Sequence, residues 1–117
     1  MPTYRVSPSS SGSVVVRVDG ELVGATPPFS IPPELRQHFD ADEARSMEVE
    51  LSGVEVIDLE GVGFLLFLWR EARRRGRPLR IRGPQGSVRA KLQQTGVLEL
   101  LEGEGQSGMT ASAGSTL

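Results

Sequence analysis

The sequence predicts a single α/β domain, and two observations on one central stretch carry that prediction. Residues 47–57 hold short apolar segments rich in β-branched side chains, as in a buried β-strand. Val62–Trp69 is then densely apolar, and the polar segment that follows it is long enough to continue a helix. A buried strand that leads into such a helix forms the core of small α/β domains. The 117 residues suit one such domain.

The central stretch divides into three predicted pieces. A strand runs through Met47–Leu51, Ser52–Val54 has the composition of a turn, and Val56–Ile57 is a short extra strand segment. Asp58 is a good helix N-cap, because its carboxylate can accept hydrogen bonds from the unpaired N–H groups of the first turn. Glu60 adds a second negative charge where the helix dipole favours one.

Two strands are predicted near the N-terminus. Thr3–Val6 is a short candidate, and the valine-rich segment Val14–Val18 is the clearest strand of the chain. Ser7–Ser13 combines proline, glycine and serine, which is typical of a turn. We therefore expect an antiparallel hairpin at one edge of the sheet.

A proline-rich segment follows the hairpin. Four prolines within Thr26–Pro33 keep the backbone extended and prevent a helix before Pro33. Glu34–Phe39 then forms a short helix, and Asp40–Ser46 is a polar loop or helix end. The segment is either a rigid surface loop or a dedicated binding loop. The side chains expected to anchor this region to the core are Phe29, Ile31, Leu35 and Phe39.

The second half of the chain continues the alternation of helix and strand. Arg70–Arg77 ends the central helix at Gly76, with its positive charges at the negative end of the helix dipole. This run is either a solvated helix end or a basic patch for an acidic or phosphate-bearing partner. Pro78–Arg82 alternates apolar and charged residues, as in a strand with one buried face. The remaining expected elements are a helix over Ser87–Gln94 with Val88 and Leu92 inward, a last helical turn over Glu99–Leu101, and a disordered tail over 103–117.

The composition excludes several classes of function. Cysteine is absent, which excludes disulfides and thiolate chemistry. A single histidine with scattered carboxylates is a poor set of metal ligands, so neither a metal nor a cofactor is expected. A net charge of -2 gives no sign of nucleic-acid or membrane affinity. No secretory signal follows Met1, and the longest apolar run is far below the roughly 20 residues of a membrane span. We expect a soluble, cytoplasmic protein without membrane insertion.

The residue pattern also argues against an enzyme, and no catalytic residue is expected. His38 is the one histidine, and it lacks an obvious serine partner, so a surface histidine is the better interpretation. Asp58 and Glu60 diverge at a helix start, which makes capping more economical than acid–base catalysis. Gly61 and Gly63 form a G-x-G without a third glycine, since position 66 is leucine.

Several segments of the central stretch together resemble the STAS domain, the fold of bacterial anti-sigma-factor antagonists. The matching residues are Leu51-Ser52-Gly53-Val54, Ile57-Asp58, Gly61 and Gly63. The resemblance implies a STAS-like domain over 1–102, with a mixed sheet of about four strands and helices packed on one face. Regulatory members of the family carry a phosphorylatable serine directly after the aspartate, where this chain has Leu59. No phosphorylation is therefore expected at Leu59.

The resemblance implies a protein-interaction module of bacterial transcription regulation. Its partner would be an anti-sigma or kinase-like ATPase protein, bound without the serine switch. The alternative is a STAS subunit or scaffold of a larger complex, such as a lipid-transporting ABC system with its ATPase subunit. A third hypothesis is nucleotide or small-molecule binding at the strand-to-helix junction, and a dimer is left open.

The partner-binding residues expected from the resemblance lie at this junction. They are Asp58, Leu59, Glu60, Gly61 and Val62. By position Leu59 is either an exposed apolar contact in an acidic frame or a core residue turned inward, and the sequence leaves both open.

Overall fold

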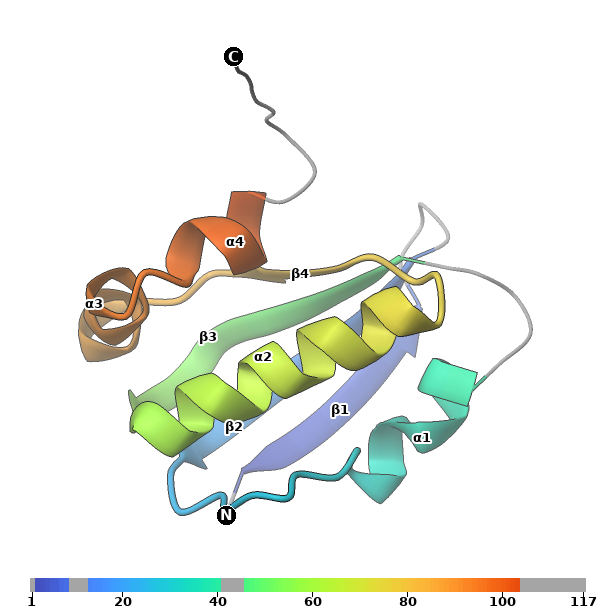
Figure 1. Ribbon diagram of the computed structural model, residues 1–117, viewed down its shortest axis with the longest axis horizontal. Coiled ribbons are helices and arrows are strands. Elements are labelled where there is room, and N and C mark those ends of the chain that lie inside the picture. Colours follow the sequence, from blue (N-terminus) through green and yellow to red (C-terminus); the bar gives the residue numbers. More distant parts are fainter. Residues whose placement is uncertain (1, 9–12, 41–45, 104–117) are drawn as a thin grey trace.

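The computed structural model describes residues 2–8, 13–40 and 46–103, which form one four-stranded sheet and four helices (Figure 1). The strands are β1 Thr3–Pro8, β2 Val14–Leu22, β3 Met47–Ile57 and β4 Leu79–Arg82. The helices are α1 Pro33–Asp40, α2 Leu59–Arg74, α3 Gly86–Gln94 and α4 Leu98–Gly103. The strand order is β1-β2-β3-β4, with β1 antiparallel to β2 and the other neighbours parallel. The prediction of a single α/β domain with a mixed four-stranded sheet is confirmed.

The β1–β2 pair is the antiparallel hairpin expected at one edge of the sheet, with Val6 opposite Val16. Both strands are longer than predicted, because β1 continues to Pro8 and β2 to Leu22. The rest of the expected turn, residues 9–12, lies outside the described residues.

The turn expected at Ser52–Val54 is wrong, because β3 runs through this segment without interruption. Between the Arg17–Glu50 pair and the Asp19–Gly53 pair, β3 holds one more residue than β2, which makes a β-bulge. The Asp19 carboxylate lies so close to Gly53 that a Cβ on this glycine would collide with it. The glycine that suggests a turn in the sequence instead allows a bulge beside a charged side chain.

The sheet has one apolar and one charged face. Alternate side chains of β2, β3 and β4 enter a single core to which all four helices contribute. On the opposite face, Arg82 Nη1 lies 2.8 Å from a carboxylate oxygen of Glu48, and Arg82 Nε lies 2.5 Å from one of Glu50. These charged side chains remain partly exposed, so that face is open to solvent. The strand residues of the core are Val16, Val18, Leu22, Met47, Val49, Leu51, Val54, Ile57, Leu79 and Ile81.

Helix α2 lies across the apolar face (Figure 1). Its buried side chains recur every three or four residues, which places one stripe of the helix against the sheet. The helix ends where the sequence predicts, since Arg75 is its C-cap and Gly76 has a left-handed φ of 73°. The buried side chains of α2 are Val62, Phe64, Leu65, Leu68 and Ala72.

The proline-rich segment leads into α1, and its expected anchors pack as predicted. Ile31, Leu35 and Phe39 are buried, and the half-buried Phe29 packs against the core. The segment contains a cis peptide bond between Pro27 and Pro28. Residues 41–45 of the expected polar loop lie outside the described part of the chain.

The C-terminal elements agree with the sequence prediction. Val88 and Leu92 of α3 are fully buried, and α4 extends the expected turn at both ends, from Leu98 to Gly103. Residues 104–117 of the expected tail lie outside the described residues, so the domain boundary at 102 stays a prediction. Within residues 2–8, 13–40 and 46–103, no helix combines the length and apolar character that a membrane crossing requires.

Candidate functional site

The junction between β3 and α2 is built on Asp58, which caps the helix as the sequence predicts. Its backbone is extended, and its Oδ1 accepts a hydrogen bond of 2.7 Å from the Gly61 N–H. The Val62 N–H donates to the Asp58 carbonyl at 3.0 Å, which closes the first turn. The expected acidic residue of that turn, Glu60, is present and exposed. The helix therefore begins at a position that its own sequence specifies.

The same carboxylate also binds the loop that follows β2. The sequence did not indicate this second contact. Asp58 Oδ2 accepts a hydrogen bond of 3.1 Å from the Gly24 N–H. The Asp58 N–H in turn donates to the Leu22 carbonyl at 3.2 Å. The bond from Gly24 and then that from Gly61 lower the pKa of Asp58, because both stabilise the charged carboxylate. One aspartate thus fixes the helix start and the neighbouring loop together.

Gly61 is required by the closeness of α2 to the end of β2. A Cβ at this position would collide with the Leu22 carbonyl oxygen and crowd the Ile57 side chain. Gly63 differs, since a Cβ there would make an ordinary contact of 3.5 Å with the ring of Phe29. Only the first of the two glycines is needed for backbone contact between helix and sheet.

The five residues expected to bind a partner divide into an exposed and an unexposed group. Leu59 is 64% exposed, so it is not the inward-turned core residue that the sequence left open as an alternative. Glu60 is exposed beside it. Asp58 is half-buried and engaged in capping, while Gly61 and Val62 are buried in the helix–sheet interface. In this structure, therefore, Gly61 and Val62 do not offer a surface to a partner.

Further exposed side chains lie at the end of the sheet where β2 and β3 finish, the end from which α2 begins. Val23 follows β2 and is 41% exposed, and Val56 of β3 is 44% exposed. Glu21 and Glu55 are exposed near the C-terminal ends of β2 and β3. Register places Glu21 opposite Val56, so apolar and acidic side chains alternate there. We call Val23, Val56, Leu59 and Glu60 the junction surface.

The arginine run at the other end of α2 is largely engaged within the molecule. Glu71 accepts hydrogen bonds from Arg75 Nη1 at 2.7 Å and from Arg74 Nη1 at 3.0 Å. The Arg73 guanidinium lies 4.8 Å from the centre of the Trp69 ring, and Arg77 is 5% exposed. These contacts favour the helix-end interpretation over the basic-patch interpretation.

His38 lies apart from the junction, on α1. It is half-buried, and its Nε2 lies 3.4 Å from Gln37 Nε2. Asp58 and Glu60 have separate surroundings, because the Asp58 carboxylate caps the helix and Glu60 is exposed to solvent. They are not arranged as an acid–base pair.

Comparison with solved structures finds chains that are similar to this one. The chain is similar in structure to an anti-sigma-factor antagonist, a STAS domain from Rhodobacter sphaeroides, at 20% identity over 71% of this chain and 87% of that chain, with a TM-score of 0.47. It is also similar to the anti-sigma factor antagonist SpoIIAA in its unphosphorylated form, at 15% identity over 93% of this chain and 88% of that chain, with a TM-score of 0.48. No curated protein sequence matches the chain.

The family assignment rests on the sequence itself. The model of the STAS domain matches residues 4–108, which include the sheet, α2 and the whole junction. The chain therefore belongs to the STAS domain family.

Proposed function

We propose that this chain is a non-enzymatic protein-interaction module that binds its partner through the junction surface. The observation that carries the proposal is the 64% exposure of Leu59 at the first position of α2. An exposed leucine gains free energy only when another surface covers it, by about 1.5–3 kcal/mol for full burial. Val23 and Val56 extend the apolar area at the same end of the sheet. Membership of the STAS family supports a binding role over catalysis.

The backbone that carries Leu59 is fixed at both sides, which favours a well-defined contact. Asp58 caps the helix below it, and Gly61 seats the first turn on the Leu22 carbonyl. A backbone segment that is held in place before binding loses less conformational entropy when the complex forms. Leu59 is thus suited to insert into a partner as a central apolar contact.

The charge around Leu59 indicates the partner's chemistry. Glu60 and the nearby Glu21 and Glu55 are exposed carboxylates. A complementary surface therefore has an apolar pocket with a basic rim. Following the resemblance to anti-sigma-factor antagonists, we propose a regulatory protein of the anti-sigma or kinase-like ATPase class, acting in bacterial transcription control in the cytoplasm.

This interaction would have no serine switch at the junction. Leu59 carries no hydroxyl, and Ser52 is the one hydroxyl residue between positions 52 and 63. The Ser52 side chain is half-buried and accepts a hydrogen bond of 3.4 Å from Arg17 Nη1. Incubation with the partner and ATP should therefore leave the 52–63 segment unmodified, and phosphate found there by mass spectrometry would contradict this part of the proposal.

The test begins with the native partner. The protein is isolated from its source cells with its bound proteins, and the partner is identified and purified. Calorimetry then compares the unchanged chain with Leu59→Ser and Leu59→Asp. Leu100→Ser is the matched control, because Leu100 is also an exposed leucine, at 38%, but lies on α4 beside β4.

We expect Leu59→Ser to weaken binding and Leu59→Asp to weaken it further, because the second adds a carboxylate to an acidic frame. Leu100→Ser should bind as tightly as the unchanged chain. Equal affinities for all variants, or an equal loss in Leu59→Ser and Leu100→Ser, would show that the junction is not the interface. A stable assembly with an ABC ATPase subunit would instead assign the chain to a larger transport complex.

A further inference from the structure

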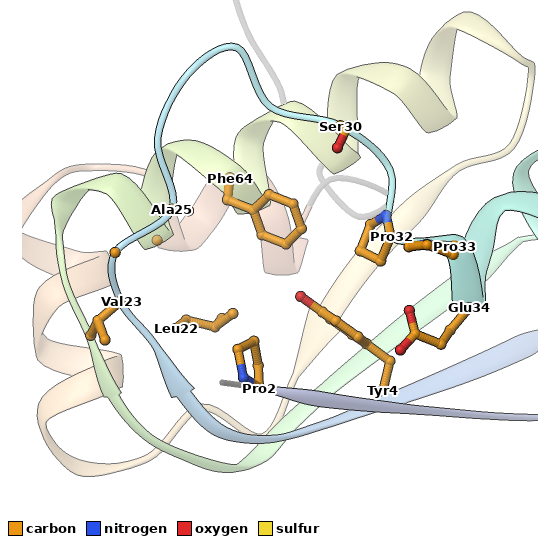
Figure 2. A pocket seen from close by; sticks show the side chains of 12 residues that line it. Pro2, Tyr4, Leu22, Val23, Ala25, Ser30, Pro32, Pro33, Glu34 and Phe64 are labelled. Atoms are coloured by element: carbon orange, nitrogen blue, oxygen red, sulfur yellow. The ribbon is translucent and has the colours of Figure 1, made fainter.

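A cavity of about 500 Å³ lies beside the junction, between β1, the proline-rich segment and the first turns of α1 and α2 (Figure 2). Most of its wall is apolar and comes from elements far apart in the sequence. Leu22 and Phe64 are lining residues that also belong to the core, and Pro2, Ala25 and Pro32 are half-buried lining residues. A volume of this size is typical of sites for small molecules.

A few polar groups converge on this apolar space. Figure 2 shows the ring of Tyr4 reaching from β1 into the cavity, with its hydroxyl directed into the space below Phe64. The carboxylate of Glu34 lies beside that ring, at the start of α1. Ser30 adds a second hydroxyl at the rim. Apolar walls with a small number of directed polar groups are the usual composition of a selective site.

The charge of the lining is one-sided. Glu34 supplies a carboxylate, while the lining that falls within residues 2–8, 13–40 and 46–103 contains no lysine, arginine or histidine. An anionic ligand such as a nucleotide or a carboxylic acid would find no cationic side chain in this described lining and would be repelled by Glu34. A ligand cation would meet a carboxylate and two aromatic side chains, Tyr4 and Phe64, whose rings can attract it.

We propose that this cavity binds a small organic amine, with an apolar body against Leu22 and Phe64 and its ammonium group at Glu34 and Tyr4. The ammonium would donate to the Glu34 carboxylate, and the Tyr4 hydroxyl can accept or donate a second hydrogen bond. Of the nucleotide or small-molecule binding that the sequence analysis considers near this junction, the described lining favours a small molecule without a phosphate group, because it offers no cationic side chain to such a group.

The state of Tyr4 agrees with this arrangement. Burial and then the nearby Glu34 charge raise the pKa of Tyr4 to about 12. The phenol therefore stays neutral at physiological pH and keeps its proton available for hydrogen bonding. Gly24 also lines the cavity, and its N–H binds Asp58, so a bound ligand would touch the loop held by the helix cap.

Three probe molecules of similar shape and different charge test the proposal on the full chain. They are 2-phenylethylamine, 2-phenylethanol and 3-phenylpropionate, which are cationic, neutral and anionic at neutral pH. Binding is followed through the amide NMR signals of the protein. The variants are Glu34→Gln, which removes the charge but keeps the shape, and Glu99→Gln, which removes an exposed carboxylate from α4.

We expect the amine to bind most tightly and the acid least, with shifts at Gly24, Ala25 and Gly61. Glu34→Gln should weaken amine binding about three- to tenfold and leave the alcohol unchanged. Glu99→Gln should change neither. The proposal is wrong if the acid binds as well as the amine, if both variants weaken the amine equally, or if no probe shifts the cavity signals.

Discussion

The Asp58 carboxylate accepts a hydrogen bond from the Gly24 N–H, 34 residues earlier in the chain, at 3.1 Å. The other oxygen of the same carboxylate caps α2 through the Gly61 N–H at 2.7 Å. The helix start and the loop after β2 therefore share one side chain. This relationship ties the junction surface to the rim of the cavity and makes Asp58 the first target for mutation.

Replacing Asp58 tests both of its hydrogen bonds. Asp58→Ala should lower the free energy of unfolding by about 0.5–2 kcal/mol, because the capping acceptor is lost. Asp58→Asn should lose less, since asparagine is also a good N-cap. Urea denaturation followed by circular dichroism measures both. An unchanged midpoint for Asp58→Ala would mean that the carboxylate does not stabilise the helix start.

The lowered pKa of Asp58 predicts a dependence of stability on pH. Because the folded state lowers this pKa below that of the unfolded chain, the carboxylate contributes stability above about pH 4. That contribution disappears as the pH falls through the folded pKa. Stability should therefore decline less steeply in acid for Asp58→Asn than for the unchanged chain. Parallel curves of unfolding free energy against pH would contradict this.

The two glycines of the first α2 turns should respond oppositely to alanine. Gly61→Ala should destabilise the fold, because the new Cβ would collide with the Leu22 carbonyl. Gly63→Ala should stabilise it by up to about 1 kcal/mol, since alanine favours the helix and its Cβ meets the Phe29 ring at 3.5 Å. Thermal and urea unfolding compare the pair. A stabilising Gly61→Ala would show that the close contact between helix and sheet is wrong.

The burial along α2 predicts unequal effects for two neighbouring leucines. Leu65 is 2% exposed, whereas Leu66 is only half-buried. Leu65→Ala should lower the free energy of unfolding by about 2–5 kcal/mol through the cavity it leaves. Leu66→Ala should cost less than half as much. If Leu66→Ala proved the more damaging of the two in urea denaturation, the orientation of α2 would be rotated from the one described.

Tyr4 is the one tyrosine of the chain, so its ionisation can be followed without interference from other phenols. Its phenolate absorbance should appear near pH 12 in the folded protein and near about pH 10 in urea. Between these values the unfolded chain loses a proton that the folded chain keeps, so stability falls as the pH rises through this window. Circular dichroism at each pH confirms that the fold persists. A folded-state titration near pH 10 would place Tyr4 in solvent.

Local patterns in the sequence predicted most of the secondary structure and one part of the candidate site, the Asp58 cap. The aspartate cap at Asp58, the glycine stop at Gly76 and the alternation in Pro78–Arg82 act within a few residues, so the pattern alone indicates them. The same local logic failed at Gly53. A glycine between strand segments suggests a turn, but β3 continues through Gly53 with a bulge against β2, where Asp19 of the neighbouring strand leaves no room for a Cβ.

The tertiary structure decided which side chains of the candidate site are exposed and which residues meet around the cavity. Leu59 is the first residue of an apolar helix, and its local pattern fits exposure and burial equally. Its 64% exposure follows from the direction in which the capped helix crosses the sheet. The sequence did not predict the cavity, because its lining residues Tyr4, Glu34 and Phe64 come from three elements that are distant in the chain. Sequence periodicity reports neighbours along the chain, and these contacts depend on packing across it.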